Sequence, residues 1–269
     1  MSLEWNDDNE EIKTALAEKA EEVRLNQGVR ASEIFSGKVE VAPIKKIFGE
    51  SAQMFSDIIR ERLGAEGGNY RMADFGSHKG ELLENICKSL PEFNFHTIGI
   101  DLENNLKENK AAQEKISADL GNIPMKDKSV DIGFARYVLH WNNPEEQKQI
   151  LKEISRIIKD FAIIQHVGAD SEDPTQWRGK VDDLLDGKEI PKLERHGHFF
   201  SSSQEVEKIL IENNIPFEKV LEVRVDNLSE TLSQRFSLDE EERQLTKEML
   251  KGNDYIMQTT WIIKPSDWK

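Results

Sequence analysis

From residue 70 onward, apolar residues along the chain follow two alternating spacings. Short apolar runs bounded by turn residues predict buried strands, and apolar residues recurring every three to four positions predict amphipathic helices. This alternation is typical of α/β proteins built on a doubly wound, mostly parallel sheet, here with seven strands. The fifth strand is apolar almost throughout, as expected of a central strand covered on both faces. The expected strands cover residues 70–75, 93–100, 116–118, 130–135, 161–167, about 217–225 and about 255–263.

Helices are expected in the segments between most of these strands. Asn143, Pro144 and Glu146 have the residue types that begin a helix, with the asparagine as N-cap and the proline in the first turn. Ser202 and Glu205 have the spacing of a capping box. The expected helices follow residue 80, cover about 104–115 with a polar, Asn-rich sequence, follow residues 143 and 202, and cover about 238–251.

Two segments depart from this alternation. Residues 1–67 are helix-prone throughout, with an acidic first part and a helically spaced apolar stripe after Pro43, and the glycines that follow Leu63 close the segment. We expect an N-terminal helical segment, 1–67, that covers the functional site of a domain at 68–269. Residues 168–198 are polar and contain Gly and Pro, so they predict an insertion after the fifth strand that acts as a lid.

Composition narrows the class of protein. The chain has 269 residues with 36 basic and 51 acidic side chains, a net charge of −15 that disfavours nucleic acid or anionic lipid as a partner. No apolar run is long enough to span a membrane, and the opening residues lack a secretory signal pattern. The single cysteine, Cys87, excludes an intrachain disulfide. These features predict a cytoplasmic protein without a membrane partner.

Acidic residues follow three predicted strands, at the sheet edge where ligands bind in this class of fold. The first strand runs into Asp-Phe-Gly-Ser-His-Lys-Gly at residues 74–80, hereafter the glycine turn. Its glycines let a ligand approach the backbone, and the next helix offers free N–H groups. Asp101 ends the second strand and suits the two hydroxyls of a ribose. The trio Ala-Asp-Leu at 118–120 follows the third strand and can hold an adenine by its amino group and its face.

This ordered set resembles the class I S-adenosylmethionine-dependent methyltransferases, specifically the small-molecule kind with a type 11 methyltransferase domain. The resemblance covers residues 70–167, including Ile123-Pro124 and the Lys128–Asp131 lead into the fourth strand. It implies a Rossmann-like fold, S-adenosylmethionine as cofactor and S-adenosylhomocysteine as product. In that family Asp74 begins the glycine motif, Asp101 binds the ribose and Asp119 binds the adenine amine. The residues that we assign to the cofactor are Asp74, Gly76, Ser77, His78, Gly80, Asp101, Leu102, Asp119, Leu120 and Arg136.

The chain departs from the family at His78, where the glycine motif usually has glycine. A histidine there predicts an unusual backbone conformation, or an imidazole against the methionine part of the cofactor. Some carboxyl methyltransferases of small acids also lack this glycine and also carry Leu-His-Trp after the fourth strand, as residues 139–141 do here. His78 also motivates a second hypothesis, a non-catalytic methyltransferase-like protein that binds the cofactor or a partner.

Two further classes of protein are disfavoured by the residues themselves. A nicotinamide dinucleotide enzyme would place a diphosphate at the glycine turn, where Asp74 would repel it. The same carboxylate suits a ligand that carries an ammonium and a sulfonium. A nucleic-acid methyltransferase is opposed by the negative charge, and residues 142–145, Asn-Asn-Pro-Glu, lack the aromatic residue after proline that base-amino methylation motifs carry.

The expected reaction is in-line displacement by an oxygen, nitrogen or carbon atom of a small-molecule acceptor. A carboxylate acceptor needs no deprotonation, whereas a hydroxyl acceptor needs a base, for which His140 and His166 are the candidates. His196 and His198 lack neighbouring carboxylate or thiol partners, so no metal site is expected. The residues that we assign to the acceptor pocket are Gln53, Tyr137, Trp141, Trp177 and Arg178.

Overall fold

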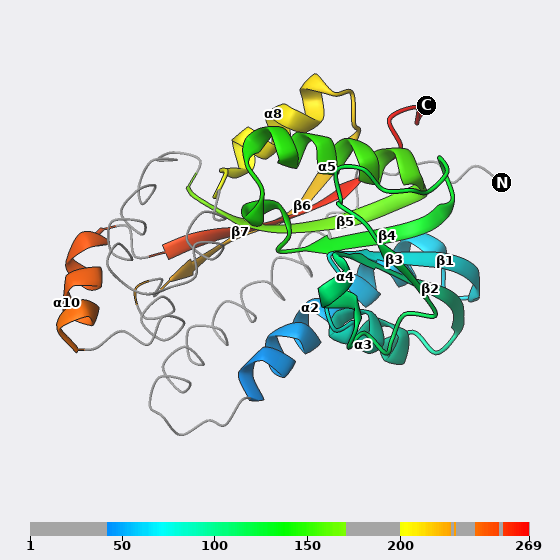
Figure 1. Cartoon of the computed structure of the whole chain (residues 1–269), viewed down its shortest axis with the longest axis horizontal. Helices are drawn as coiled ribbons and strands as arrows, with labels where there is room; N and C mark the ends of the chain where they lie inside the picture. The colour runs from blue at the N-terminus through cyan, green and yellow to red at the C-terminus, as the bar shows by residue number, and fades with distance from the viewer. Residues whose placement is uncertain (1–41, 171–199, 227–228, 230–239, 253–254, 269) are drawn as a thin grey trace.

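The computed structural model describes residues 42–170, 200–226, 229, 240–252 and 255–268. Its centre is a seven-stranded sheet in the order β3-β2-β1-β4-β5-β7-β6 (Figure 1). Strands β1 to β5 are parallel, and β7 is antiparallel to both of its neighbours, so the predicted mostly parallel sheet is confirmed. The strands are β1 Gly68–Phe75, β2 Phe93–Asp101, β3 Glu114–Ser117, β4 Val130–Arg136, β5 Ile158–Gly168, β6 Phe217–Asp226 and β7 Tyr255–Ile263.

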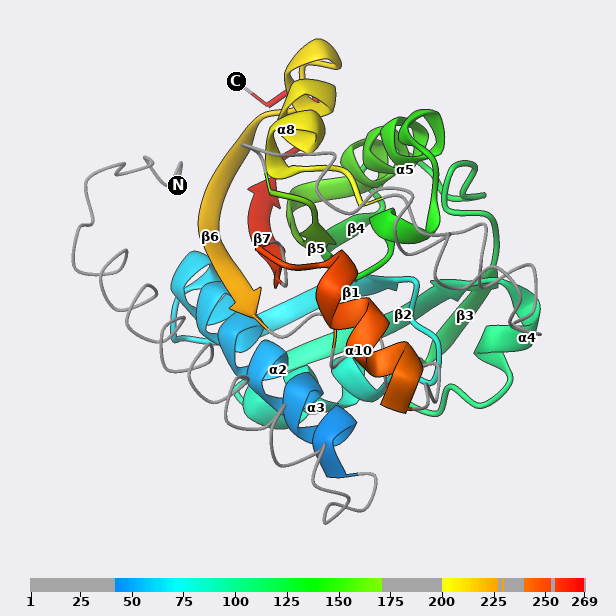
Figure 2. The same ribbon diagram turned by 90° about the vertical axis from the view of Figure 1, so that its left-hand side faces the viewer.

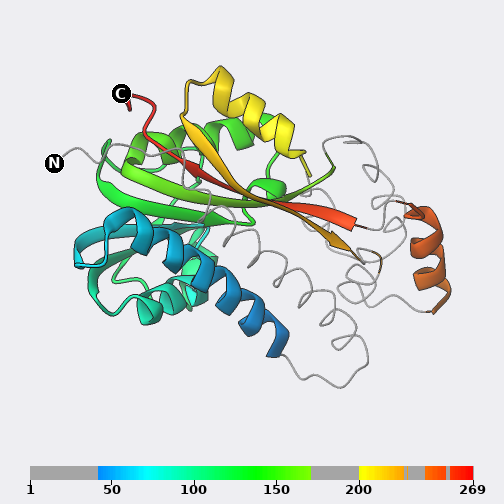
Figure 3. The same ribbon diagram turned by 180° about the vertical axis from the view of Figure 1, so that it is seen from behind.

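Helices cover both faces of the sheet. In Figures 1 and 2, α2 and α3 lie on one face, and α5 and α8 lie on the other. Figure 3, which shows the molecule from behind, has α2 running across the sheet and beyond it. The described helices are α2 Ala42–Leu63, α3 Glu81–Ser89, α4 Glu103–Leu106, the 3-10 helix η1 Leu139–Trp141, α5 Pro144–Ile157, α8 Ser203–Glu212 and α10 Glu240–Met249.

Each face of the sheet has its own apolar core, because successive strand residues point to opposite faces. In β4, Phe134 belongs to the core under α2 and α3, whereas Ala135 belongs to the core under α5 and α8. Helix α2 contributes Phe55, Ile58 and Ile59, all about 1% exposed or less, to the first of these cores. Residues 52–63 of the predicted N-terminal segment are therefore part of the packing of the domain.

The predicted starts of α5 and α8 are confirmed by their capping geometry. The Asn143 side chain accepts hydrogen bonds from the N–H groups of Glu145 and Glu146, and the Glu146 side chain accepts one from the Asn143 N–H. Ser202 and Glu205 form the same reciprocal pair at α8. These caps satisfy N–H groups that the first helical turn leaves without partners.

The predicted helix at 104–115 is wrong in extent. Helix α4 ends at Leu106, and β3 begins at Glu114 rather than at residue 116. Asn109 explains the difference, because its buried side-chain oxygen accepts hydrogen bonds from the N–H groups of Ala111 and Ala112. An asparagine that bonds nearby backbone competes with the helix. The chain therefore turns at Asn109 and reaches the sheet edge earlier than predicted.

The lid expected at 168–198 falls mostly outside the described residues, apart from Gly168, Ala169 and Asp170. The β5 strand itself begins at Ile158, three residues before the predicted start at 161. Within the described ranges, no helix combines the length and apolar character needed to cross a membrane.

The chain order of the strands creates one crevice at the centre of the sheet. Strand β1 pairs with β2 on one side and with β4 on the other. The connections that leave β1 and β4 therefore diverge, which makes this a topological switch point, where ligands of α/β sheets bind beyond the carboxyl ends of the strands. The glycine turn, Asp101 and Arg136 all lie at this edge.

Candidate functional site

The glycine turn leaves β1 sharply and folds back against the end of β2. The N–H groups of Gly76 and Ser77 both donate to the carbonyl oxygen of Ile100, at 2.8 and 3.2 Å. Gly76 has φ +83°, and a Cβ at this position would overlap the Val138 side chain. Glycine is therefore required at 76 for both its backbone angle and the lack of space.

His78 adopts the left-handed conformation expected from its place in the motif, with φ +42°. This conformation costs a non-glycine residue roughly 1–2 kcal/mol. The His78 side chain is exposed, and its backbone N–H donates to Asp101 Oδ2 at 2.9 Å. The turn therefore keeps its shape without glycine at 78, and the imidazole does not fill the turn.

Asn109 braces the end of the glycine turn, a role that the sequence did not reveal. Its Nδ2 donates to Ser77 Oγ at 3.0 Å, and its side chain is fully buried. Gly80, at φ +77°, lies so close to Asn109 that a Cβ would overlap the amide oxygen. The helix α3 then begins at Glu81, with the turn held against the segment that precedes β3.

Asp101 is 9% exposed at the tip of β2, and its carboxylate organises the site. Oδ1 accepts hydrogen bonds from the Leu102 N–H and from Asn105 Nδ2, both at 2.7 Å. Oδ2 accepts the His78 N–H. A carboxylate oxygen can accept about two hydrogen bonds, so Oδ2 retains capacity for a hydroxyl. Leu102 is 60% exposed beside it, an apolar surface at the mouth of the site.

Asp74 lies deeper in the same crevice. It is 3% exposed and stands in register with Gly99 of β2 and Phe134 of β4. Burial, and to a lesser degree the negative charge of Asp101, hold the pKa of the Asp74 carboxyl well above its ordinary value, against the opposing effect of Arg136. Within the described residues the Asp74 carboxyl group has no hydrogen-bond donor.

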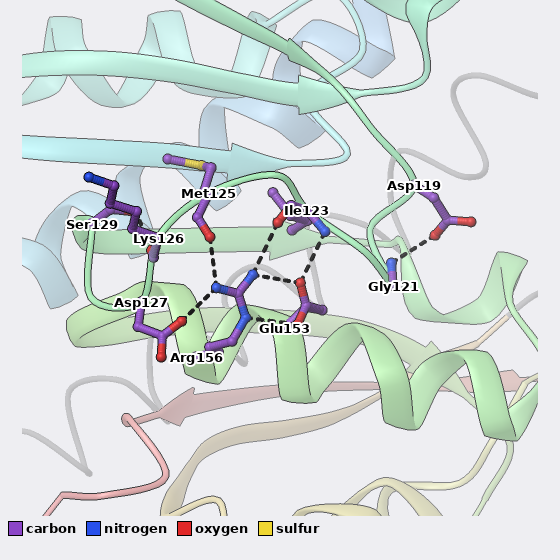
Figure 4. Close-up of polar contacts among 9 residues, drawn as sticks. All are labelled: Asp119, Gly121, Ile123, Met125, Lys126, Asp127, Ser129, Glu153 and Arg156. Atoms are coloured by element: carbon purple, nitrogen blue, oxygen red, sulfur yellow. Dashed lines mark hydrogen bonds and ion pairs between the residues drawn. The ribbon is translucent and has the colours of Figure 1, made fainter.

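The Asp119 segment lies beside the tip of β2. The Ala118 N–H donates to the Asp101 carbonyl oxygen at 3.0 Å, which ties the two acidic residues to one edge. Asp119 is exposed, and its Oδ1 accepts the Gly121 N–H at 2.7 Å (Figure 4). Leu120 packs against the core beneath α5. The structure thus brings together the three acidic residues that the sequence assigned to the cofactor.

Arg136 belongs to a polar cluster on the α2 side of the sheet, formed with Ser51, Gln165 and Thr260. Arg136 Nε donates to Ser51 Oγ and to Gln165 Oε1, both at 3.0 Å. Gln165 Nε2 donates to Thr260 Oγ1 at 3.4 Å. Gln165 and Thr260 are about 1% exposed or less, and Ser51 is also buried. The sequence identified only Arg136 of these four residues.

Tyr137 connects this cluster to β7. It has φ +56°, and its hydroxyl donates to Gln258 Oε1 at 2.6 Å. The Arg136 guanidinium carbon lies 3.9 Å from the centre of the Tyr137 ring, within the range of a cation–π interaction.

The two candidate bases lie on the opposite side of the sheet end. His140 is 6% exposed, and its ring stacks on that of Phe200 at a centroid distance of 5.6 Å. His166 is 1% exposed, and its Nε2 bonds to the Ser201 carbonyl oxygen at 2.9 Å. Burial lowers the pKa of His166 to about 4, despite the raising effects of Ser201 and Glu205. His166 is therefore neutral at pH 7.

Among the remaining residues predicted for the acceptor pocket, Gln53 does not join this cluster. Gln53 is exposed on α2, where its Nε2 donates to Asp57 of the same helix at 2.8 Å. Trp141 is the last residue of η1. Trp177 and Arg178 lie outside the described residues. Ser51, two residues before Gln53 on α2, reaches Arg136 and Gln165 at the carboxyl ends of β4 and β5.

Comparisons with known proteins agree with this geometry. Residues 73–164 match the family model of a methyltransferase domain, whereas no curated protein matches the chain. The solved structure of YcgJ from Bacillus subtilis has a TM-score of 0.58 at 15% identity, over 80% of this chain and 97% of that one. Loganic acid methyltransferase with S-adenosylhomocysteine has a TM-score of 0.54 at 13% identity, over 82% and 93%.

A third similar structure is geranyl diphosphate C-methyltransferase from Streptomyces coelicolor A3(2), with a TM-score of 0.52 at 14% identity over 80% of each chain. At such identities the likeness concerns the fold. The methyltransferase domain implies S-adenosylmethionine as cofactor, in agreement with the sequence prediction. The family match, the strand order and the strand-end residues converge, and the chain therefore contains, at residues 73–164, a methyltransferase domain with the class I S-adenosylmethionine-dependent fold.

Proposed function

We propose that the chain binds S-adenosylmethionine across the carboxyl ends of β1, β2 and β3 and methylates a small carboxylic acid. One observation carries the cofactor part: Asp74 is 3% exposed and has no hydrogen-bond donor within the described residues. Burial disfavours the ionised form of a carboxyl group that has no protein donor, and it raises the pKa of Asp74. The ammonium group of the cofactor's methionine part supplies both the donors and the opposite charge.

The other residues at this edge fit the rest of the cofactor. Asp101 Oδ2 has capacity for a ribose hydroxyl. Asp119 is exposed and held by the Gly121 N–H, so its second oxygen is available to the adenine amine. Leu102, 60% exposed next to Asp101, offers apolar contact to the adenine ring. Gly76, Ser77 and Gly80 let the methionine part pass close to the backbone.

The sulfonium cofactor supplies an activated methyl group with a good leaving group. The protein therefore contributes mainly by bringing the reactants together, orienting them and excluding water. The polar cluster around Arg136 lies near Asp74 at the ends of β4 and β5, and we assign the acceptor to this position. Tyr137, held by Gln258, forms one wall of this position.

Two features favour a carboxylic acid as the acceptor. The half-buried Arg136 guanidinium is oriented by Ser51 and Gln165 at the end of β4 and suits a carboxylate. His166 has a pKa of about 4, which makes it a weak base, and a carboxylate needs none. A hydroxyl acceptor would instead depend on His140. The similar fold named for loganic acid methyltransferase gives an organic acid as a precedent.

Calorimetry with S-adenosylhomocysteine, S-adenosylmethionine and NAD tests the cofactor part. We expect the first two to bind and NAD to give no heat. Asp101→Ala should weaken S-adenosylhomocysteine binding about tenfold or more, because charge-assisted hydrogen bonds contribute about 1.5–3 kcal/mol. Asp267→Ala, at an exposed ion pair with Lys128 on the loop before β4, is the control and should not change the affinity. Binding of NAD alone would contradict the proposal.

Methyl-labelled cofactor tests the acceptor part, with phenylacetate, phenethylamine and benzyl alcohol as matched probes. Methylation of a carboxylate gives an ester, which base hydrolyses to volatile methanol, whereas labelled amines and ethers are stable. We expect base-labile label from the acid alone. Label in the amine or alcohol would overturn the carboxylate assignment. Cofactor binding without turnover across a wider set of acids would favour the non-catalytic hypothesis.

A further inference from the structure

Two charged side chains of α5 hold the connection between β3 and β4, residues 118–129 (Figure 4). Arg156 Nη1 donates to the Met125 carbonyl oxygen at 2.7 Å and to Asp127 Oδ1 at 2.8 Å. Its Nη2 donates to the Ile123 carbonyl oxygen at 3.0 Å. One guanidinium therefore bonds three residues of the connection.

Glu153, one helical turn earlier in α5, completes the arrangement. Its Oε2 accepts the Ile123 N–H at 3.0 Å, so Ile123 is held through both its N–H and its carbonyl group. The Glu153 carboxylate also accepts Arg156 Nε and Nη2, at 2.9 and 2.7 Å. Hydrogen bonding to Arg156 lowers the pKa of Glu153, so the pair stays ionised at neutral pH. Bidentate ion pairs between arginine and a carboxylate are stronger than pairs with a single hydrogen bond.

Few backbone hydrogen bonds help to hold the connection in place. In the described structure, the backbone of the connection bonds to the backbone of other elements through the Ala118 N–H to Asp101 and the Lys128 N–H to Arg156. Between these ends, Asp119 bonds only locally, to the N–H groups of Gly121 and Asn122. The position of Asp119 therefore depends on Ile123, four residues later, and on the side chains that fix it.

We infer that Glu153 and Arg156 are positioning residues for Asp119 and set the selectivity of the site for the adenine amine. The inference rests on the proposed function, because it takes Asp119 as the acceptor of that amine. Neither side chain needs to touch the ligand. Their loss should leave contacts to the ribose and the methionine part intact while the Asp119 carboxylate loses its fixed place.

The test compares two ligands that differ at the adenine amine, S-adenosylhomocysteine and S-inosylhomocysteine, by calorimetry on the full chain. The wild type should prefer the adenosyl ligand about tenfold or more, and Asp119→Ala should remove this preference. Arg156→Met should reduce it to less than about threefold. Glu153→Gln, which keeps the shape of the side chain but weakens its hold on Ile123 and Arg156, should reduce it by an intermediate factor.

Arg71→Met is the matched control. Arg71 Nε donates to the Ser129 carbonyl oxygen at 2.9 Å, so this variant also releases a backbone carbonyl of the same connection, at the end remote from Asp119. It should retain the preference of the wild type. Arg156→Lys keeps the positive charge and can make one or two of the hydrogen bonds of Arg156, so it should restore part of the preference that Arg156→Met loses.

The outcomes separate the inference from the proposed function. A folded Arg156→Met or Glu153→Gln protein with the full preference of the wild type overturns the inference, as does equal loss in Arg71→Met. If Arg156→Met fails to fold, Glu153→Gln decides. A wild type that binds both ligands equally overturns the role of Asp119 but leaves cofactor binding in place. A wild type that binds neither overturns the proposed function itself.

Discussion

Folding favours the protonated form of the Asp74 carboxyl group, whereas ligand binding favours its ionised form. Burial and the neighbouring Asp101 charge raise its pKa in the free protein. The folded state then keeps a proton that the unfolded chain has already released. Stability must therefore fall as the pH rises through the raised pKa of Asp74. An ammonium ligand favours the ionised form, so ligand affinity should rise over the same pH interval.

Asp74→Asn separates these two effects. We expect a higher thermal unfolding midpoint than the wild type at pH 8, with a smaller difference near pH 4, because asparagine has no charge to bury. Affinity for S-adenosylhomocysteine should fall about tenfold to a hundredfold with the loss of a charge-assisted bond. Calorimetry and thermal unfolding measure both. Asp160→Asn is the control, because burial also raises the pKa of Asp160, which lies away from the site. The affinity of this variant for S-adenosylhomocysteine should equal that of the wild type.

His78→Gly concerns the departure from the family motif. Glycine removes the cost of the left-handed conformation, roughly 1–2 kcal/mol, which stabilises the folded protein. It also raises the entropy of the unfolded chain, which destabilises the folded protein by about 0.4–1 kcal/mol. Stability should therefore change by about 1 kcal/mol or less, measured by urea unfolding. Because the imidazole is exposed and only the His78 N–H bonds Asp101, ligand affinity should stay within about threefold.

A large gain in ligand affinity for His78→Gly would mean that the histidine obstructs the site, and would favour the non-catalytic hypothesis. Gly80→Ala provides the contrast. Its Cβ would overlap the Asn109 amide at a left-handed position, so it should weaken both stability and binding.

Residues at strand ends were predictable, whereas the residues that hold them were not. Asp74, Asp101 and Asp119 follow apolar runs, and this pattern fixes their edge of the sheet without any knowledge of the tertiary contacts. Asn109 bonds Ser77 across 32 positions, and Ser51 bonds Gln165 across 114. Nothing local marks a serine or asparagine for such a role, because its partner is chosen by packing.

At the scale of elements, α2 links the N-terminal part of the chain to the polar cluster. Its residue Ser51 contacts Arg136 and Gln165. Ser51→Ala should leave affinity for S-adenosylhomocysteine unchanged but raise the KM for the acceptor several-fold, since a hydrogen bond contributes about 0.5–1.5 kcal/mol. Steady-state kinetics with a carboxylic acid acceptor checks this.

Ser56→Ala is the control on the same helix. Ser56 is fully buried, but its hydroxyl donates to the Ala52 carbonyl within α2 rather than to the cluster. It should leave the KM for the acceptor unchanged. An equal KM change in both variants would mean that α2 acts only through its packing.

Elements with strong apolar periodicity were predicted to within a few residues. The helix predicted at 104–115, which lacks such periodicity, was not. The α5 and α8 starts are encoded by capping residues next to an apolar stripe, two signals that agree. Residues 104–115 had helix-compatible residues but no apolar stripe. The buried Asn109 side chain then decided the local structure, and it did so through tertiary contacts that a helical pattern cannot contain.

At the scale of the molecule, a net charge of −15 acts on any charged ligand. S-adenosylmethionine is a net cation, S-adenosylhomocysteine has no net charge, and a carboxylate acceptor is an anion. Salt screens these attractions and repulsions over about 10 Å at 0.1 M. Raising the salt concentration from about 10 to about 200 mM should therefore weaken the binding of S-adenosylmethionine and leave that of S-adenosylhomocysteine nearly unchanged. The same change should lower the KM of the carboxylate acceptor. Calorimetry and kinetics across a salt series measure the three trends.

An acceptor whose KM rises with salt would contradict the assignment of an anionic substrate. A similar trend for both cofactor forms would mean that local contacts at the site, rather than the field of the whole chain, set the salt dependence.

The position of β7 has a consequence for how the protein is made. β7 lies between β5 and β6, yet it follows both in the chain. A ribosome therefore releases β5 and β6 before the strand that joins them exists, and each has an open edge during that interval. Such edges pair with other chains. A chain interrupted before Tyr255 would keep Asp74, Asp101 and Asp119 but lose Gln258 and Thr260. It would also expose those edges, so we expect it to aggregate rather than persist as a shorter protein.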